Sequence, residues 1–140
     1  MEQGTAAKAF IINGKNEILL IRRSHDDVHK PGIWEVPGGR LEPEEHIFDG
    51  LKREAKEETG LDISINSPLK EHNFTREDGQ RIRMLTYMCR LSDSLGSGSA
   101  SVVLSNEHSD HEWLSLDDAK SRIVEDFNEE IEAIKNAFKC

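Results

Sequence analysis

Three glutamates stand close together in the stretch REAKEETG, which runs from Arg53 to Gly60. Glu54, Glu57 and Glu58 follow the spacing i, i+3 and i+4, so an α-helix would place all three on one face. Two unit charges about 4 Å apart repel by about 4 kcal/mol at an effective dielectric constant of about 20, although exposed carboxylates avoid most of this cost in water. The spacing leaves two interpretations open, a solvated acidic helix or a carboxylate cluster that a cation compensates.

The positive residues nearby do not neutralise these glutamates. Lys52 and Lys56 stand at neither three nor four residues from any of the three, and Arg53–Glu57 is the one opposite-sign pair at helical spacing among them. Hard divalent cations such as Mg²⁺ or Mn²⁺ bind oxygen ligands and would compensate such a concentration of charge. The local pattern therefore favours a metal site, with the solvated helix as the alternative.

The segment around the glutamates has the pattern of a helix from about Glu44 to Thr59, because apolar residues recur there at three- and four-residue steps. Pro43 suits the first helical position, and Gly60 suits the position just after the end. Gly50 is unusual inside a helix, where glycine costs up to about 1 kcal/mol relative to alanine. Its presence indicates either close packing or a tolerated defect.

Short apolar runs predict strands on both sides of this helix. Residues 5–13 and 16–22 are expected to form one hairpin, and residues 69–77 and 81–91 a second hairpin around Asp78-Gly79. A short strand in IWEV stops at Pro37, a last strand is expected near Val102–Leu104, and residues 115–138 read as one amphipathic C-terminal helix. Strands and helices that mix without strict alternation suggest an α/β layered sandwich.

The composition is that of a soluble globular chain, and we expect residues 1–140 to form a single domain. Hydrophobic residues make up 36% and charged residues 32% of the sequence. The net charge of −9 argues against a nucleic-acid polymer or an anionic membrane surface as partner. A small phosphorylated ligand remains compatible with this charge, because a bound metal can reverse the local sign.

The first residues and the cysteines do not suggest export. The opening MEQGTAAKAF lacks the basic and apolar regions of a signal peptide, and no apolar run approaches the roughly 20 residues that span a bilayer. Cys89 stands in an apolar run and is expected in the core, while Cys140 is the last residue. We therefore expect a cytoplasmic protein without a disulfide framework, whose oligomeric state the sequence leaves open.

The glutamates belong to a longer pattern. From Gly39 the chain reads GRLEPEEHIFDGLKREAKEETGL, or G-x5-E-x7-R-E-U-x-E-E-x-G-U, with Ala55 and Leu61 at the apolar U positions. This segment resembles the Nudix box of the Nudix hydrolases, with every fixed position present and Pro37-Gly38 just before it. Ala55 is smaller than the bulky aliphatic residue usual at its position.

The resemblance implies a Nudix α/β/α sandwich, a mixed sheet with the box helix and a C-terminal helix, in which the box binds Mg²⁺ (or Mn²⁺) against a diphosphate. By position, the metal ligands would be Glu54, Glu57, Glu58 and the Gly38 carbonyl. Arg53 would orient Glu54 by a charge-assisted hydrogen bond. Glu45 would hold Arg53 in place and, with Gly39, would support the site.

Three residues outside the box are further candidates. Glu107, in SNEHSDHEW, lies in the loop where many family members carry an additional metal-binding glutamate, and either Glu54 or Glu107 could deprotonate the attacking water. Arg23 resembles the phosphate-contacting basic residue of the mutator-type (MutT-like) branch. Asn128 resembles the asparagine that reads the base in that branch. A solvated surface position is the alternative for Glu107, Arg23 and Asn128 alike.

The family's reaction is hydrolysis of a nucleoside diphosphate linked to another group. We expect a Mg²⁺-dependent pyrophosphohydrolase that cuts a (deoxy)nucleoside triphosphate, oxidised nucleotides included, to the monophosphate and pyrophosphate. Two alternatives stay open: an enzyme that cleaves ADP-ribose or another nucleotide sugar, and a non-catalytic module that binds nucleotides. The sequence does not determine the preferred nucleobase.

Overall fold

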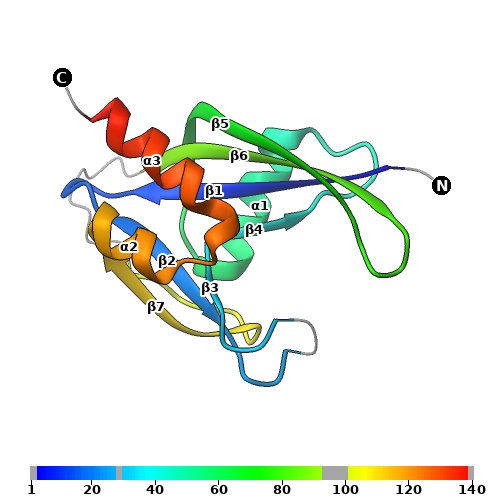
Figure 1. The fold of residues 1–140 in the computed structure, drawn as a ribbon, viewed down its shortest axis with the longest axis horizontal. Helices are drawn as coiled ribbons and strands as arrows, with labels where there is room; N and C mark the ends of the chain where they lie inside the picture. The colour runs from blue at the N-terminus through cyan, green and yellow to red at the C-terminus, as the bar shows by residue number, and fades with distance from the viewer. Residues whose placement is uncertain (1–2, 28–29, 93–100, 139–140) are drawn as a thin grey trace.

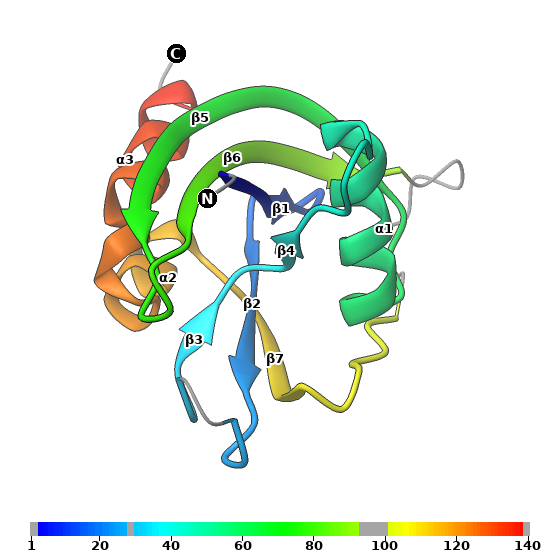
Figure 2. The ribbon, with the colours of Figure 1, turned by 90° about the vertical axis from the view of Figure 1, so that its right-hand side faces the viewer.

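The structure is a computed structural model that describes residues 3–27, 30–92 and 101–138. A mixed seven-stranded sheet lies between α1 (Ile47–Thr59) on one face and α2 (Leu116–Arg122) and α3 (Asn128–Ala137) on the other (Figures 1 and 2). The 3-10 turn η1 (Glu125–Phe127) joins α2 to α3. The predicted α/β sandwich is confirmed. No helix in the described ranges is long and apolar enough to cross a bilayer.

The sheet has the strand order β3-β2-β1-β6-β5, with β4 paired to β1 and β7 paired to β2. The strands are β1 (Gly4–Ile12), β2 (Ile18–Arg23), β3 (Trp34–Glu35), β4 (Gly38–Arg40), β5 (Ile63–Thr75), β6 (Arg81–Leu91) and β7 (His108–Leu114). β1 runs parallel to β6 along its whole length, from Gly4 opposite Ile82 to Ile12 opposite Arg90. This central pair lies at the middle of the fold.

The second predicted hairpin is confirmed, because β5 and β6 pair antiparallel from Ile63 to Thr75. The first is only partly right: β1 and β2 are antiparallel, but they pair only where Ile12 faces Ile18. Beyond that point β4 takes the edge of β1 and β3 takes that of β2, while β7 pairs with the other edge of β2 along its whole length. The divergence of β1 from β2 brings β4, with its two glycines, beside β1.

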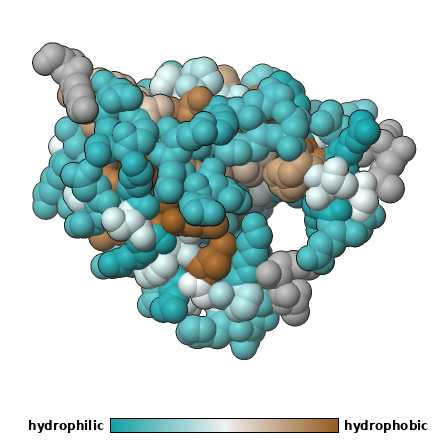
Figure 3. All heavy atoms as spheres, in the orientation of Figure 1, coloured by the Kyte–Doolittle hydropathy of each residue, from teal (hydrophilic) through white to brown (hydrophobic). Residues whose placement is uncertain are grey.

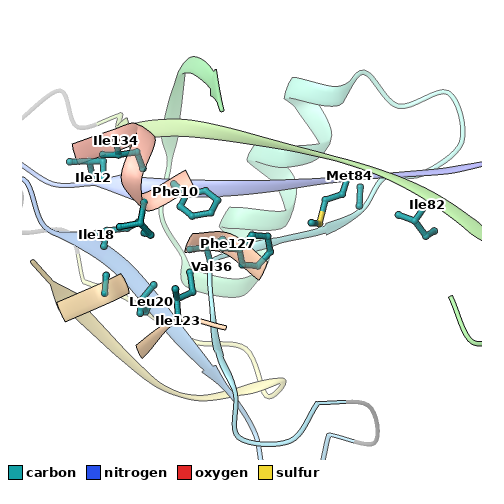
Figure 4. Packing of buried hydrophobic residues seen from close by; sticks show 13 residues of the cluster. Phe10, Ile12, Ile18, Leu20, Val36, Ile82, Met84, Ile123, Phe127 and Ile134 are labelled. Atoms are coloured by element: carbon teal, nitrogen blue, oxygen red, sulfur yellow. The ribbon is translucent and has the colours of Figure 1, made fainter. Parts of the chain in front are cut away.

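Both faces of β1 are buried, which explains its nearly continuous apolar sequence. Ala6, Phe10 and Ile12 belong to the core under α2 and α3, while the alternating residues Ala7 and Ala9 belong to the core under α1. Phe10 packs edge to face against Phe127, with ring centroids 5.6 Å apart (Figure 4). Cys89 lies in the α1 core as predicted, and burial raises the pKa of its thiol to about 12.

Helix α1 begins at Ile47, three residues later than the prediction from Glu44. Glu44 has a φ of 67°, a left-handed conformation that an α-helix does not continue through, and Pro43 lies in the turn before the helix. His46 is the N-cap, and its Nδ1 accepts a backbone N–H at 3.1 Å. Gly60, with a φ of 75°, ends the helix as predicted.

The C-terminal part differs from the prediction in two ways. Val102–Leu104 form no strand within the described range 101–138; β7 begins at His108 instead, where β2 requires an antiparallel partner. Residues 115–138 are not one helix, because Ile123 and Val124 are extended, with ψ of 151° and 134°. The break lets Ile123 and Phe127 enter the core together.

Gly50 lies where α1 packs against the loop before it. A Cβ atom at this position would overlap the Leu41 side chain and lie 2.8 Å from Glu45 Oε1. Close packing, rather than a tolerated defect, therefore explains the glycine.

Gly50→Ala tests this packing. Alanine would stabilise an isolated helix by up to about 1 kcal/mol, but the overlap should destabilise the protein by about 1–3 kcal/mol. We expect a lower midpoint in urea unfolding, whereas Lys52→Ala, at an exposed position of the same helix, should change it little. A Gly50→Ala protein more stable than the wild type would show that the packing is loose.

Candidate active site

The turn at Gly38 joins β3 to β4. Gly38 has a φ of 135°, and a Cβ there would overlap the backbone carbonyl of Ala7, so this position requires glycine. Its N–H points to the Glu58 carboxylate, with distances of 3.2 and 3.4 Å to the two oxygens. Its carbonyl oxygen accepts a hydrogen bond from Lys8 Nζ at 3.3 Å. Both polar groups of this one residue therefore meet charged side chains.

The three box glutamates differ in burial. Glu58 is 6% exposed, and its loss of hydration raises the pKa of the carboxyl to about 8. Glu54 is half-buried beside Gly39, and burial, together with the charge of Glu57, raises its pKa as well. The Glu57 side chain is 58% exposed. Two of the three charges are thus incompletely compensated by the protein.

Arg53 lies between the acidic groups of the box. Its guanidinium donates to Glu45 at 2.7 and 3.0 Å, and it lies 3.3 Å from Glu54 and 3.2 Å from Glu57. The Arg53 hydrogen bonds lower the pKa of Glu45 to about 2. The contacts agree with the predicted chain from Glu45 through Arg53 to Glu54, while the catalytic roles of these residues stay predictions.

The donor set suits a hard cation. Within the described ranges, no three histidine, cysteine or acidic residues form a ready-made cluster for a metal ion. The raised pKa values of Glu54 and Glu58 nevertheless indicate that the protein alone does not stabilise the ionised carboxylates, which a bound cation would. Oxygen ligands only, from carboxylates and a carbonyl, are the set that Mg²⁺ and Mn²⁺ prefer.

A cavity of about 980 Å³ adjoins the turn, with Gly39 in its wall. In Figure 3 the surface is open between the β5–β6 hairpin and the loop that follows β2, within a mainly hydrophilic face. Six positive side chains line the cavity, Lys8, Arg23, Lys30, Arg40, Lys70 and Arg76, against five negative ones, Glu35, Glu71, Glu77, Asp78 and Asp126. The wall thus carries one more positive than negative side chain, in a chain of net charge −9.

Glu35 lies in the cavity wall and contacts His108, the first residue of β7. Its carboxylate lies 3.2 Å from Lys8 Nζ, 3.0 Å from Arg23 and 2.9 Å from His108 Nε2. Burial alone would raise the pKa of Glu35, but Lys8, His108 and Arg23 together lower it to about 2. Sequence reasoning missed both Glu35 and Lys8; the signal was a lysine inside the apolar run TAAKAFII.

The predicted phosphate contact, Arg23, does lie in the cavity wall. Its guanidinium is held by Asp27 at 2.7 Å and by Glu35 at 3.0 Å. These two carboxylates fix the position of the side chain.

The other two candidates, Glu107 and Asn128, do not line the cavity. Glu107 is exposed and lies just before β7. Its backbone accepts a hydrogen bond from Ser24 N–H and donates one to Ser105 Oγ, whereas its side chain makes none with the described residues. Ser105 donates its N–H to the Glu58 carbonyl at 3.3 Å, which brings this loop to the end of α1. Asn128 begins α3 outside the cavity wall, and its Oδ1 is buried without a hydrogen-bond partner in the described part of the chain.

Comparisons with known proteins agree with this geometry. The family model for the NUDIX domain matches residues 2–134. The chain is 29% identical over 117 residues to nucleoside triphosphatase NudI of Klebsiella pneumoniae (strain 342), covering 79% of this chain and 82% of that protein. A solved MutT protein from Methanosarcina mazei Go1 superposes with a TM-score of 0.80 and 28% identity, covering 100% of this chain and 99% of that one.

A plant relative matches a shorter region. Nudix hydrolase 2 of Arabidopsis thaliana is 39% identical over 61 residues, which are 44% of this chain and 22% of that protein. The present chain therefore spans about a fifth of that longer relative and most of the bacterial one.

Glu58→Gln tests the uncompensated charge. Because the folded-state pKa of about 8 lies above the ordinary 4.5, the folded chain keeps this proton more tightly than the unfolded chain. Metal-free protein should lose stability as the pH rises from 4.5 through 8, and the glutamine variant should lose less. One unit of pKa difference is worth about 1.4 kcal/mol.

Thermal unfolding in EDTA, at about pH 5 and about pH 8.5, measures the effect. The variant should be the more stable protein only at the higher pH, and added Mg²⁺ should stabilise the wild type more than the variant. Identical pH profiles for the two proteins would mean that Glu58 carries no excess charge in the fold.

Proposed function

We propose, because this chain belongs to the NUDIX domain family, that it is a Mg²⁺-dependent pyrophosphohydrolase that cuts a (deoxy)nucleoside triphosphate to the monophosphate and pyrophosphate. The observation that carries the proposal is the partly buried carboxylate pair, Glu54 and Glu58, against the Gly38–Gly39 turn. A cavity with a positive excess adjoins that turn. Relatives named as hydrolases and triphosphatases support the reaction class.

The proposed metal ligands are Glu54, Glu57, Glu58 and the Gly38 carbonyl. A divalent ion bound there supplies neutralisation of the phosphate charge and acidification of water. Lys8 donates to the same Gly38 carbonyl, so its ammonium must share or release that oxygen when a cation binds.

The chain's own residues position the reactants. Arg53, anchored by Glu45, orients the Glu54 carboxylate. Either Glu54 or Glu107 acts as the general base that accepts a proton from the attacking water. The water oxygen bonds to phosphorus, the bond to the leaving phosphate oxygen breaks, and the pyrophosphate leaves with that electron pair.

The positive residues of the cavity support a triphosphate as substrate. Arg23 and Lys8 line the wall nearest Glu35, and each keeps a fixed position through that carboxylate. A guanidinium and an ammonium at fixed positions suit phosphate oxygens. Lys8 thereby joins Arg23 as a proposed phosphate contact.

The first experiment incubates the protein with Mg²⁺ and a panel of (d)NTPs, oxidised (d)NTPs, ADP-ribose, dinucleoside polyphosphates and nucleotide sugars. Chromatography should show a monophosphate and pyrophosphate from a triphosphate. Cleavage of ADP-ribose, with no cleavage of any triphosphate, would support the alternative of a nucleotide-sugar pyrophosphatase. Absence of turnover on the whole panel at high protein concentration would support a binding module.

Glu57→Gln tests the metal assignment with the least effect on folding, since Glu57 is exposed. Loss of a residue that only hydrogen-bonds to a metal ligand typically costs roughly 10–100-fold, and we expect kcat/KM to fall by more than this. The thermal midpoint in EDTA should not change. Asp49→Asn, also acidic on α1 but in the first turn, is the matched control and should retain full activity. Near-normal turnover by Glu57→Gln would refute the ligand role.

Glu54→Gln and Glu107→Gln separate the two candidate bases. The variant that removes the base should lower kcat by roughly 100-fold or more at saturating Mg²⁺, with a smaller change in KM. The pH–rate profile should lose its acidic limb in that variant alone. Unaltered kcat in Glu107→Gln would assign the proton to Glu54.

A further inference from the structure

Lys8 is a nearly buried lysine in the middle of β1. Its side chain is 11% exposed and lines the cavity, although its neighbours in the run TAAKAFII are small or apolar. Three acceptors lie within hydrogen-bond distance of Nζ: Glu35 Oε1 at 3.2 Å and the carbonyl oxygens of Val36 and Gly38, both at 3.3 Å. An ammonium carries three N–H donors and no acceptor, so these three contacts use its whole capacity.

The strand pairing brings this ammonium to the turn between β3 and β4. Lys8 faces Gly38 in the antiparallel pair of β1 and β4, which lie side by side in Figure 2. Residues directly opposite each other on paired strands direct their side chains to the same face of the sheet. Because Gly38 has no side chain, it leaves room for the Lys8 side chain to lie against the carbonyls of the turn.

The charge of Lys8 acts on the proposed metal ligands. Burial raises the pKa of the Glu58 and Glu54 carboxyls, and the positive charge of Lys8 opposes this rise in both. The Gly38 carbonyl, to which Lys8 donates, belongs to the same proposed ligand set. The metal-free protein therefore holds one of its own positive charges among the groups that are proposed to bind Mg²⁺.

Lys8 and a divalent ion would compete for the Gly38 oxygen. An ion bound there would share this oxygen with the ammonium, and the two positive charges would repel each other. Glu35 retains Lys8 when the carbonyl is lost, because its Oε1 contacts Lys8 whereas the other two side chains that bind this carboxylate contact Oε2. The displaced ammonium thus stays at the cavity wall with an N–H donor free for a ligand.

We propose that Lys8 is the internal counter-cation of the metal-free site: a divalent ion displaces its ammonium from the Gly38 carbonyl, and the released N–H binds a phosphate oxygen of the substrate. Lys8 then weakens cation binding without phosphate and couples it to phosphate binding. Such coupling is reciprocal, since the ion strengthens phosphate binding by the same factor. This inference rests on the metal site of the proposed function and not on hydrolysis.

Mn²⁺ binding in the absence of phosphate tests the displacement. Lys8→Met keeps a long unbranched side chain without its charge. Its Kd for Mn²⁺, measured by electron paramagnetic resonance of the free ion, should lie roughly 5-fold or more below that of the wild type, the factor for two unit charges about 4 Å apart in water. Lys15→Met removes a positive charge from an exposed turn and is the matched control, with a wild-type Kd. Equal or weaker binding by Lys8→Met, which a purely structural lysine would give, would overturn the proposal.

A double variant separates the freed carbonyl from the change in net charge. Lys8→Met/Glu35→Gln has the net charge of the wild type and leaves no carboxylate without its lysine, so it should fold even if Lys8→Met does not. Its Kd for Mn²⁺ should also lie below the wild-type value, because the Gly38 carbonyl is free. A wild-type Kd in the folded double variant would overturn the displacement. Thermal midpoints in EDTA check that each variant is folded.

Pyrophosphate tests the coupling. It should tighten Mn²⁺ binding by a factor roughly 10-fold larger in the wild type than in Lys8→Met, because only the wild type gains a charge-assisted hydrogen bond to phosphate when the ion binds. A titration without protein gives the amount of Mn²⁺ that pyrophosphate itself binds. Equal factors in the two proteins would overturn the role of Lys8 in coupling.

The binding measurements separate this inference from the proposed function. Tighter Mn²⁺ binding by Lys8→Met, without hydrolysis of any triphosphate by the wild type, would uphold the inference and refute the proposed reaction. Triphosphate hydrolysis by the wild type, with equal Mn²⁺ affinity in the two proteins, would uphold the reaction and overturn the role of Lys8. Absence of Mn²⁺ binding by the wild type would overturn both the metal site and that role.

Discussion

The contact between the Gly38 amide and the Glu58 carboxylate joins the β4 turn to α1, and the other parts of the candidate site are arranged around it. Only a glycine allows β4 to lie this close to Ala7 of β1. The contact fixes the helix so that Glu54 lies against Gly39 while Glu57 stays exposed. A buried carboxylate with a single amide donor keeps a raised pKa, and this charge is what a cation would stabilise.

Two other acids, the buried Glu35 and the partly exposed Glu45, have counter-charges within the protein. Glu35 is surrounded by Lys8, Arg23 and His108, and Glu45 by Arg53, so both have a pKa lowered to about 2 within the protein itself. These compensated acids hold cavity cations and a box arginine in place. The acids left uncompensated, Glu54 and Glu58, lie by contrast against Gly39 and Gly38 of the turn. Counter-charges within the protein thus lower the pKa of Glu35 and Glu45, whereas the pKa values of Glu54 and Glu58 stay raised, and we propose that a cation supplies the charge they lack.

Local patterns predicted the local parts of this structure. The β5–β6 hairpin followed from Asp78-Gly79, and the end of α1 followed from Gly60. The start of α1 did not follow, because the left-handed Glu44 serves a turn that apolar periodicity does not report. The site residues Lys8 and Glu35 lie 27 positions apart, and their pairing depends on β3 pairing with β2 and β4 with β1, which sequence spacing does not encode.

Titration of the metal-free protein with Mn²⁺, followed by electron paramagnetic resonance of the free ion, tests whether the box glutamates bind a divalent cation. We expect saturable binding by the wild type, tightened by pyrophosphate, because carboxylates and phosphate oxygens would share the cation. A variant with glutamine at positions 54, 57 and 58 should fold normally and leave the free-ion signal unchanged. Equal Mn²⁺ binding by that folded variant, or none by the wild type, would show that these glutamates form no cation site.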